Sequence, residues 1–268
     1  MTHPIKHVQL FAETLSLAVS DQGQGQPYLI LHGGGGPMTV AGFAGALSQS
    51  ARVIAPTHPG FAGQTRPSWF DSVSDLANAY LALLEKLDLH NVIVIGNSVG
   101  GWIAAEMALR KSPRVAGIML LNACGIDAGP SNKGIADLST VTPQDRAKLA
   151  FHDPVRYGIA PATPEAAAAM AANQQTLRVY AGAQMLDPSL RSRLAEVSIP
   201  SMVVWGESDG IVDLDYGRAF ADSMPGSQFE SVAEAGHFPH IEQQAKVVEL
   251  TERFTRMTLQ KQREQIAA

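Results

Sequence analysis

A serine stands between two glycines in the stretch Gly96-Asn97-Ser98-Val99-Gly100. The apolar, β-branched run at 91–95 is typical of a buried strand, and the run at 101–110 favours a helix. Small residues on both sides of a serine allow a strand to turn sharply into a helix, so that the hydroxyl projects above the sheet. The same letters occur in ordinary strand-to-helix turns, but with both flanks in place the pattern predicts that Ser98 is a hydrolase nucleophile.

A serine hydroxyl needs a base to remove its proton, and the base needs a carboxylate to orient it. Of the eight histidines, His237 and His240 fall in the connection between the last expected strand and the last expected helix. His237 follows a glycine, and we expect it to be the base, with His240 as the alternative. His32 and His58 follow expected strands, where roles in holding the loops are the expectation.

The candidate carboxylate is Asp209, in the stretch Trp205-Gly206-Glu207-Ser208-Asp209-Gly210 after the apolar run at 201–204. Ligands of open α/β sheets sit at the carboxyl ends of the strands, and Asp209 would hang from that edge. Some hydrolases carry the acid one strand earlier, where this chain has Asn122. Three other carboxylates nearby remain as alternatives. Asp213 and Asp215 stand where a helix is expected to begin and so suit a capping role, and Glu207 is the third.

A glycine-rich loop, Leu31-His32-Gly33-Gly34-Gly35-Gly36-Pro37, follows another expected strand. Its spacing does not fit a dinucleotide fingerprint, and Trp102 stands where a phosphate-binding P-loop after Gly96 would need its lysine. The loop is better suited to an oxyanion hole, in which the backbone N–H groups of Gly34 and Val99 stabilise the charge of a tetrahedral intermediate. No cluster of side chains has metal-ligand spacing, so neither a metal nor a cofactor is expected.

Composition narrows the class of protein. The chain has 268 residues, of which 46% are hydrophobic and 17% charged, enough for one large α/β domain with an insertion. A net charge of −5 gives no reason to expect nucleic acid or an anionic membrane as a partner. The partner expected for a hydrolase site is a small-molecule substrate. The single cysteine, Cys124, fits a reducing compartment, and no signal sequence or membrane-spanning run is visible. The expected location is therefore the cytoplasm.

Strand-like and helix-like runs alternate along most of the chain, which indicates a mostly parallel sheet covered on both faces. The alternation stops at residues 125–195, where the runs are helical, and resumes at 199–205. We therefore expect a helical insertion there. A final helix is expected at 243–258, followed by a frayed polar tail at 260–268.

Together these motifs resemble those of the α/β-hydrolase superfamily, in the family's order of serine, aspartate and histidine. The resemblance covers nearly all of the chain outside 125–195 and rests on His32-Gly33, Pro59-Gly60-Phe61, Gly96-x-Ser98-x-Gly100, Gly206-x-x-Asp209 and Gly236-His237. It implies an eight-stranded, mostly parallel sheet built from residues 1–124 and 196–268. It also implies that 125–195 form a helical cap inserted after strand six, and that Ser98, Asp209 and His237 form the catalytic triad.

The function implied is hydrolysis of a small carboxylic ester or lactone through an acyl-enzyme on Ser98. Relatives with an aspartate nucleophile, such as haloalkane dehalogenases and epoxide hydrolases, do not fit a serine at this position. Hydrolases of meta-cleavage products, which break a C–C bond, share the glycine-rich loop but usually carry tryptophan where this chain has Phe238; they are the first alternative. A receptor of the same fold with little turnover is the alternative from another class.

Overall fold

The computed structural model describes residues 5–130, 132–138, 141–158 and 163–267. Its centre is an eight-stranded sheet in the order β1-β2-β4-β3-β5-β6-β7-β8. Strands β4 to β8 run parallel to β3, and the first two form an antiparallel edge, β2 pairing antiparallel with β4. The predicted fold class is confirmed. The strands are β1 Ile5–Leu10, β2 Leu15–Gln22, β3 Pro27–Leu31, β4 Arg52–Pro56, β5 Val92–Asn97, β6 Val115–Leu121, β7 Ser201–Gly206 and β8 Gln228–Val232.

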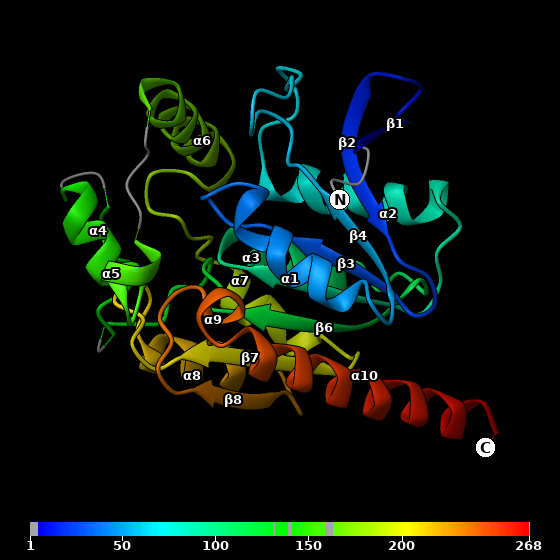
Figure 1. Ribbon diagram of the computed structural model, residues 1–268. Helices are drawn as coiled ribbons and strands as arrows, with labels where there is room; N and C mark the ends of the chain where they lie inside the picture. The colour runs from blue at the N-terminus through cyan, green and yellow to red at the C-terminus, as the bar shows by residue number, and fades with distance from the viewer. Residues whose placement is uncertain (1–4, 131, 139–140, 159–162, 268) are drawn as a thin grey trace.

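Helices cover both faces of the sheet (Figure 1). Side chains of successive strand residues point to opposite faces, so Val94 of β5 packs in one apolar cluster and Ile95 in the other. The first cluster holds the apolar sides of α2, α3 and α8, and the second those of α1 and α10. The core helices are α1 Met38–Leu47, α2 Val73–Lys86, α3 Val99–Leu109, α8 Leu214–Asp222, α9 Pro239–Glu242 and α10 Gln244–Ala267.

In the described residues between β6 and β7 the regular elements are helices joined by coil, with isolated bridges at Gly125 and Ile135 and no further strand. It contains α4 Pro143–Ala150, α5 Pro154–Tyr157, α6 Pro164–Ala181, α7 Leu190–Arg193 and the 3-10 turn η1 Leu194–Glu196. In Figure 1, α4, α5 and α6 lie toward the end of the molecule at which the arrows of β6, β7 and β8 point. We call residues 125–195 the insertion below. No helix of the described chain is long and apolar enough to cross a membrane.

The last helix differs from the sequence expectation. It does not end near residue 258 but continues to Ala267, and Figure 1 shows it extending past the sheet. The added turns are rich in Gln, Lys, Arg and Glu, which favour helix even without an apolar face. The expected frayed tail is therefore wrong over the described residues.

The buried side of α10 provides a test of this packing. Phe254 is 1% exposed, and its ring lies so close to β6 that a Cβ on Gly117 would come within 3.1 Å of its Cζ atom. Phe254→Ala should lower the free energy of unfolding by about 3–5 kcal/mol, because it removes the ring and leaves a cavity. The control is Met257→Ala on the same helix, where the side chain is 49% exposed and a change within about 0.5 kcal/mol is expected. Urea unfolding measures both, and equal losses would contradict the packing described.

Candidate active site

Ser98 occupies the turn between β5 and α3 in a strained backbone conformation. Its φ and ψ angles are 56° and −120°, in a region that costs a non-glycine residue about 1–3 kcal/mol. The turn closes only because its neighbours lack side chains. A Cβ on Gly96 would lie 2.0 Å from the Gly100 carbonyl oxygen, and one on Gly100 would lie 2.3 Å from the Leu31 carbonyl oxygen. The serine thus stands at the apex of the turn at the carboxyl end of a central strand.

His237 and Asp209 are joined by a hydrogen bond in the protein interior. The imidazole Nδ1 donates to Asp209 Oδ2 over 2.8 Å, and the two side chains are 4% and 0% exposed. The same Oδ2 accepts a hydrogen bond from Asn122 Nδ2 at 2.7 Å. The other oxygen, Oδ1, accepts from the N–H groups of Ile211 and Val212 at 2.7 and 3.1 Å. Four donors thus stabilise a buried carboxylate charge, and the proton on Nδ1 leaves Nε2 free to accept another.

The histidine loop is also bonded to the strand that carries the serine. Asn97, the last residue of β5, donates from Nδ2 to the carbonyl oxygens of His237 and Leu121, at 2.9 and 3.1 Å. The Ser98 N–H donates to the same Leu121 oxygen at 3.0 Å. The ends of β5 and β6 and the loop after β8 therefore meet at one edge of the sheet. The structure brings the three candidates Ser98, Asp209 and His237 to this edge.

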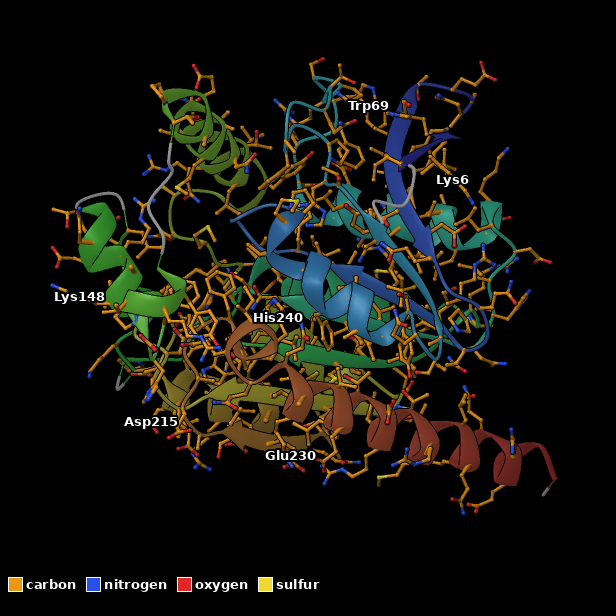
Figure 2. All side chains as sticks on the ribbon, viewed as in Figure 1. Lys6, Trp69, Lys148, Asp215, Glu230 and His240 are labelled. Atoms are coloured by element: carbon orange, nitrogen blue, oxygen red, sulfur yellow. The ribbon has the colours of Figure 1, made fainter. Side chains whose placement is uncertain are left out.

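The alternative carboxylates have other partners. Asp213 caps α8 by accepting from the Tyr216 N–H at 2.9 Å, and Glu207 accepts from the Ser231 hydroxyl at 2.7 Å. Asp215 is exposed in the first turn of α8, and Figure 2 shows it at the rim of the molecule. The hydrogen bond from His237 thus singles out Asp209 among the carboxylates considered from the sequence.

The glycine-rich loop lies directly against the serine. A Cβ on Gly33 would come within 3.0 Å of Ser98 Cβ. Val99 is the first residue of α3, and its N–H is among those that a helix leaves without an intrahelical acceptor. The amides of Gly34 and Val99 therefore belong to two segments that flank Ser98, as an oxyanion hole requires.

Two buried histidines support this loop. The rings of His32 and His58 stack with centroids 3.7 Å apart, and the His58 N–H donates to His32 Nε2 at 3.0 Å. His32 Nδ1 donates to the Gly33 carbonyl, while His58 bonds to the His32 carbonyl and to the Tyr80 hydroxyl. Burial lowers the pKa of His32 to about 4 and holds the pKa of His58 well below its usual value, so both rings are neutral. They hold the loop in place.

The long helix α6 of the insertion covers the glycine-rich loop. Gln174 Nε2 donates to the Gly34 carbonyl at 3.3 Å, and a Cβ on Gly34 would lie 2.5 Å from Leu177 Cδ2. On the neighbouring loop, Thr176 donates to the Gly60 carbonyl and Tyr180 to the Pro59 carbonyl, at 3.0 and 2.8 Å. The helix thus contacts main-chain groups of two core loops, those after β3 and β4, on one side of Ser98.

Sequence reasoning missed the two asparagines that tie the site together. Asn97 and Asn122 are polar residues at the ends of fully buried strands. A polar residue at the end of an apolar run is the sequence feature that could have indicated their role at the site. Cys124 also lies beside the site, where its N–H donates to the Ser98 carbonyl at 3.3 Å. Burial raises the pKa of its thiol to about 12, so this sulfur is neutral and a poor nucleophile at pH 7. Among the described residues, no group of His, Cys, Asp or Glu side chains could hold a metal ion.

Comparison with known proteins places the chain among hydrolases. Residues 28–250 match the model of the alpha/beta hydrolase family. A 2-hydroxymuconate semialdehyde hydrolase of Pseudomonas putida is 28% identical over 259 residues, covering 87% of this chain and 88% of that protein. Among solved structures, a bacterial membrane phospholipase A has a TM-score of 0.78 at 22% identity, covering 95% and 86% of the two chains. An esterase of Thermogutta terrifontis has a TM-score of 0.72 at 22% identity, covering 95% and 99%.

The neighbouring histidine, His240, lies in the interior (Figure 2) and gives a pH-dependent prediction. Its Nε2 donates to the Thr39 carbonyl at 3.0 Å, and burial lowers its pKa to about 4, against about 6.5 in an unfolded chain. The unfolded state therefore binds a proton that the folded state does not, and stability present above pH 6.5 is lost as the pH falls toward 4. His240→Gln should abolish this loss, which amounts to roughly 2–3 kcal/mol at pH 4.5.

Urea unfolding of the wild type and of His240→Gln at pH 7 and pH 4.5 measures the difference. Met257→Gln serves as control, because it introduces the same amide at a 49% exposed position without removing a titrating group, and it should leave the pH dependence of the wild type in place. Parallel pH profiles for wild type and His240→Gln would contradict the buried neutral state of His240.

Proposed function

This chain belongs to the alpha/beta hydrolase family, and on that basis we propose that it is a serine hydrolase of small carboxylic esters or lactones. The observation that carries the proposal is the buried hydrogen bond from His237 to Asp209, at the sheet edge where Ser98 occupies its strained turn. A serine, an imidazole with its tautomer held by a carboxylate, and backbone donors nearby are the parts that acyl transfer needs.

In the proposed reaction, His237 Nε2 takes the proton of Ser98 while Oγ attacks the carbonyl carbon of the substrate. Asp209 holds the imidazole and stabilises the imidazolium that forms. The N–H groups of Gly34 and Val99 stabilise the oxyanion, each worth about 3 kcal/mol of the barrier. The C–O bond then breaks, and the alcohol leaves with the proton from His237. A water molecule, deprotonated by His237, cleaves the acyl-enzyme and regenerates Ser98.

We propose that the insertion is the cap that shapes the substrate pocket of the core formed by 1–124 and 196–268. Support comes from α6, whose Gln174 and Leu177 lie over Gly34, the proposed oxyanion donor. Aromatic side chains lie near His237 as well. Phe151 of the insertion stacks on Phe238 at a centroid distance of 5.2 Å.

Hydrolysis of a C–C bond remains the second candidate function. It is favoured by the Pseudomonas putida relative, whose name is that of a semialdehyde hydrolase. The same three side chains would serve it, because a fold and its site residues do not by themselves fix the substrate. Phe238, in place of the tryptophan usual in such enzymes, is the observation against it.

The nucleophile can be tested by covalent labelling. A fluorophosphonate probe should label the wild-type protein at one site, and Ser98→Ala should remove the label, because the neutral thiol of Cys124 does not compete. Intact-mass analysis and peptide mapping identify the site. Stoichiometric labelling of Ser98→Ala would place the nucleophile elsewhere.

Turnover separates the candidate functions. We would assay p-nitrophenyl esters, lactones and vinylogous diketones with the wild type and with Ser98→Ala. Turnover of esters or lactones that depends on Ser98 supports the proposal, whereas turnover of diketones alone supports the C–C hydrolase. A wild type that binds but turns over none of them would indicate a receptor.

The carboxylate assignment predicts different effects for neighbouring aspartates. Asp209→Asn should lower kcat by roughly 10³–10⁴-fold, because the imidazole loses the acceptor that holds its tautomer. Asp213→Asn is the matched control, since Asp213 caps α8 and asparagine caps helices equally well. Kinetics on one p-nitrophenyl ester measure both variants. A severe loss in Asp213→Asn with a mild one in Asp209→Asn would refute the assignment.

A further inference from the structure

A single carboxylate outside the proposed triad joins the histidine loop to the insertion. Glu242, the last residue of α9, accepts from the Gly236 N–H through Oε2 at 2.7 Å. The same oxygen accepts from the His152 N–H at 3.2 Å, and Oε1 accepts from the Asp153 N–H at 3.0 Å. Gly236 precedes His237, while His152 and Asp153 connect α4 to α5. One side chain thus ties together two segments that lie far apart in the sequence.

The backbones of these segments are in direct contact. The His237 N–H donates to the Ala150 carbonyl at 2.7 Å, and the Gly210 N–H donates to the Leu149 carbonyl at 2.8 Å. A Cβ on Gly236 would lie 2.5 Å from the Ala150 oxygen, so only glycine permits the approach. The residues next to both Asp209 and His237 are therefore bonded to the end of α4. This end of the insertion is part of the frame of the site.

Three N–H groups converging on one side chain require an acceptor with two free oxygens. A carboxylate has lone pairs for all three and carries the negative charge that strengthens each bond. An amide of the same shape has one oxygen, and its NH2 group would face an N–H donor. Glutamine at 242 would therefore release part of this contact without changing the volume of the side chain.

We propose that Glu242 is a positioning residue for His237. It acts through Gly236, holding the histidine loop against residues 149–153 so that the imidazole stays on Asp209. The expected effect of Glu242 on kcat rests on the proposed function, because it presupposes that His237 acts as the base. It also makes the placement of His237 depend on the docking of the insertion, so that the 149–153 segment must stay in place when other parts of the insertion move.

The kinetic test uses p-nitrophenyl acetate, whose small acyl group makes little use of a cap. Glu242→Gln should lower kcat by about tenfold or more with KM changed less than about twofold, because the base is misplaced and the pocket is not. Glu242→Asp keeps the charge and should recover part of the loss. Glu249→Gln is the matched control, because Glu249 lies exposed on α10, with its Oε2 3.1 Å from Lys246 Nζ. The kcat of this variant should equal that of the wild type.

A double-mutant cycle separates positioning from general weakening of the fold. If Glu242 acts through the His237–Asp209 pair, Glu242→Gln should cost less than about threefold in kcat when Asp209 is already asparagine. The full tenfold loss in that background would overturn the proposal, as would an unchanged kcat or a change in KM alone. If Glu242→Gln does not fold, Glu242→Asp in both backgrounds is judged by the same comparison.

A spectroscopic readout keeps this inference separate from the proposed function. The Nδ1 proton of His237, held by Asp209, should give a downfield ¹H NMR resonance at low temperature. We expect it to shift or broaden in Glu242→Gln and to be unchanged in Glu249→Gln. An unchanged resonance in Glu242→Gln would overturn the role of Glu242 whether or not esters are hydrolysed. A shifted resonance in a protein that turns over neither esters nor lactones would refute the proposed function and leave the positioning role standing.

Discussion

The sharp turn at Ser98 is the constraint on which the rest of the site depends. The combination of φ 56° and ψ −120° is strained for a serine and persists only where the surrounding structure enforces it. The surrounding structure does so because β5 is buried by neighbours on both sides and α3 packs against the sheet with Gly100 touching the Leu31 carbonyl. Burial of a central strand and of the helix that follows it offsets the local strain. The position of the hydroxyl is thus set by the core of the protein and not by the loop itself.

Around that turn, buried polar groups satisfy one another across three strand ends. Asn97 bonds to the His237 carbonyl, and Asn122 bridges the Asp209 carboxylate and the Gly206 N–H. A buried charge without such donors would cost several kcal/mol. Each of these groups is therefore both a requirement of folding and a means of fixing its neighbour. The hydrogen bonds of Asn97 and Asn122 thus hold the strand ends and the histidine loop in one arrangement.

The turn at Ser98 and the strands around it could be predicted from local sequence patterns. The glycines around Ser98 and the apolar runs before Asp209 act over a few residues, so they can be read directly. The hydrogen-bond partners of those residues cannot be read from the sequence in this way. Asn122 lies 87 positions from Asp209, and Glu242 lies 90 positions from His152. Only the order of strands in the sheet brings them together. The tail of α10 departs from the expectation for the opposite reason: its helix follows from local propensity, although the apolar face that indicates a packed helix ends near residue 258.

The contacts of α6 have a consequence for how such proteins diverge. Its side chains bond to main-chain carbonyls of the core, those of Gly34, Pro59 and Gly60. Main-chain groups are present whatever residues the loops carry. A side chain at Gly34 or Gly60 would meet Leu177 at 2.5 Å or Thr176 at 2.7 Å, so these two positions are constrained to glycine. Substitutions elsewhere in the core loops can accumulate without undocking the helix, and the exposed positions of α6 are free to change in turn. With the insertion as the proposed cap, such an arrangement would let its outward and pocket-facing positions change while its docking on the core loops is kept.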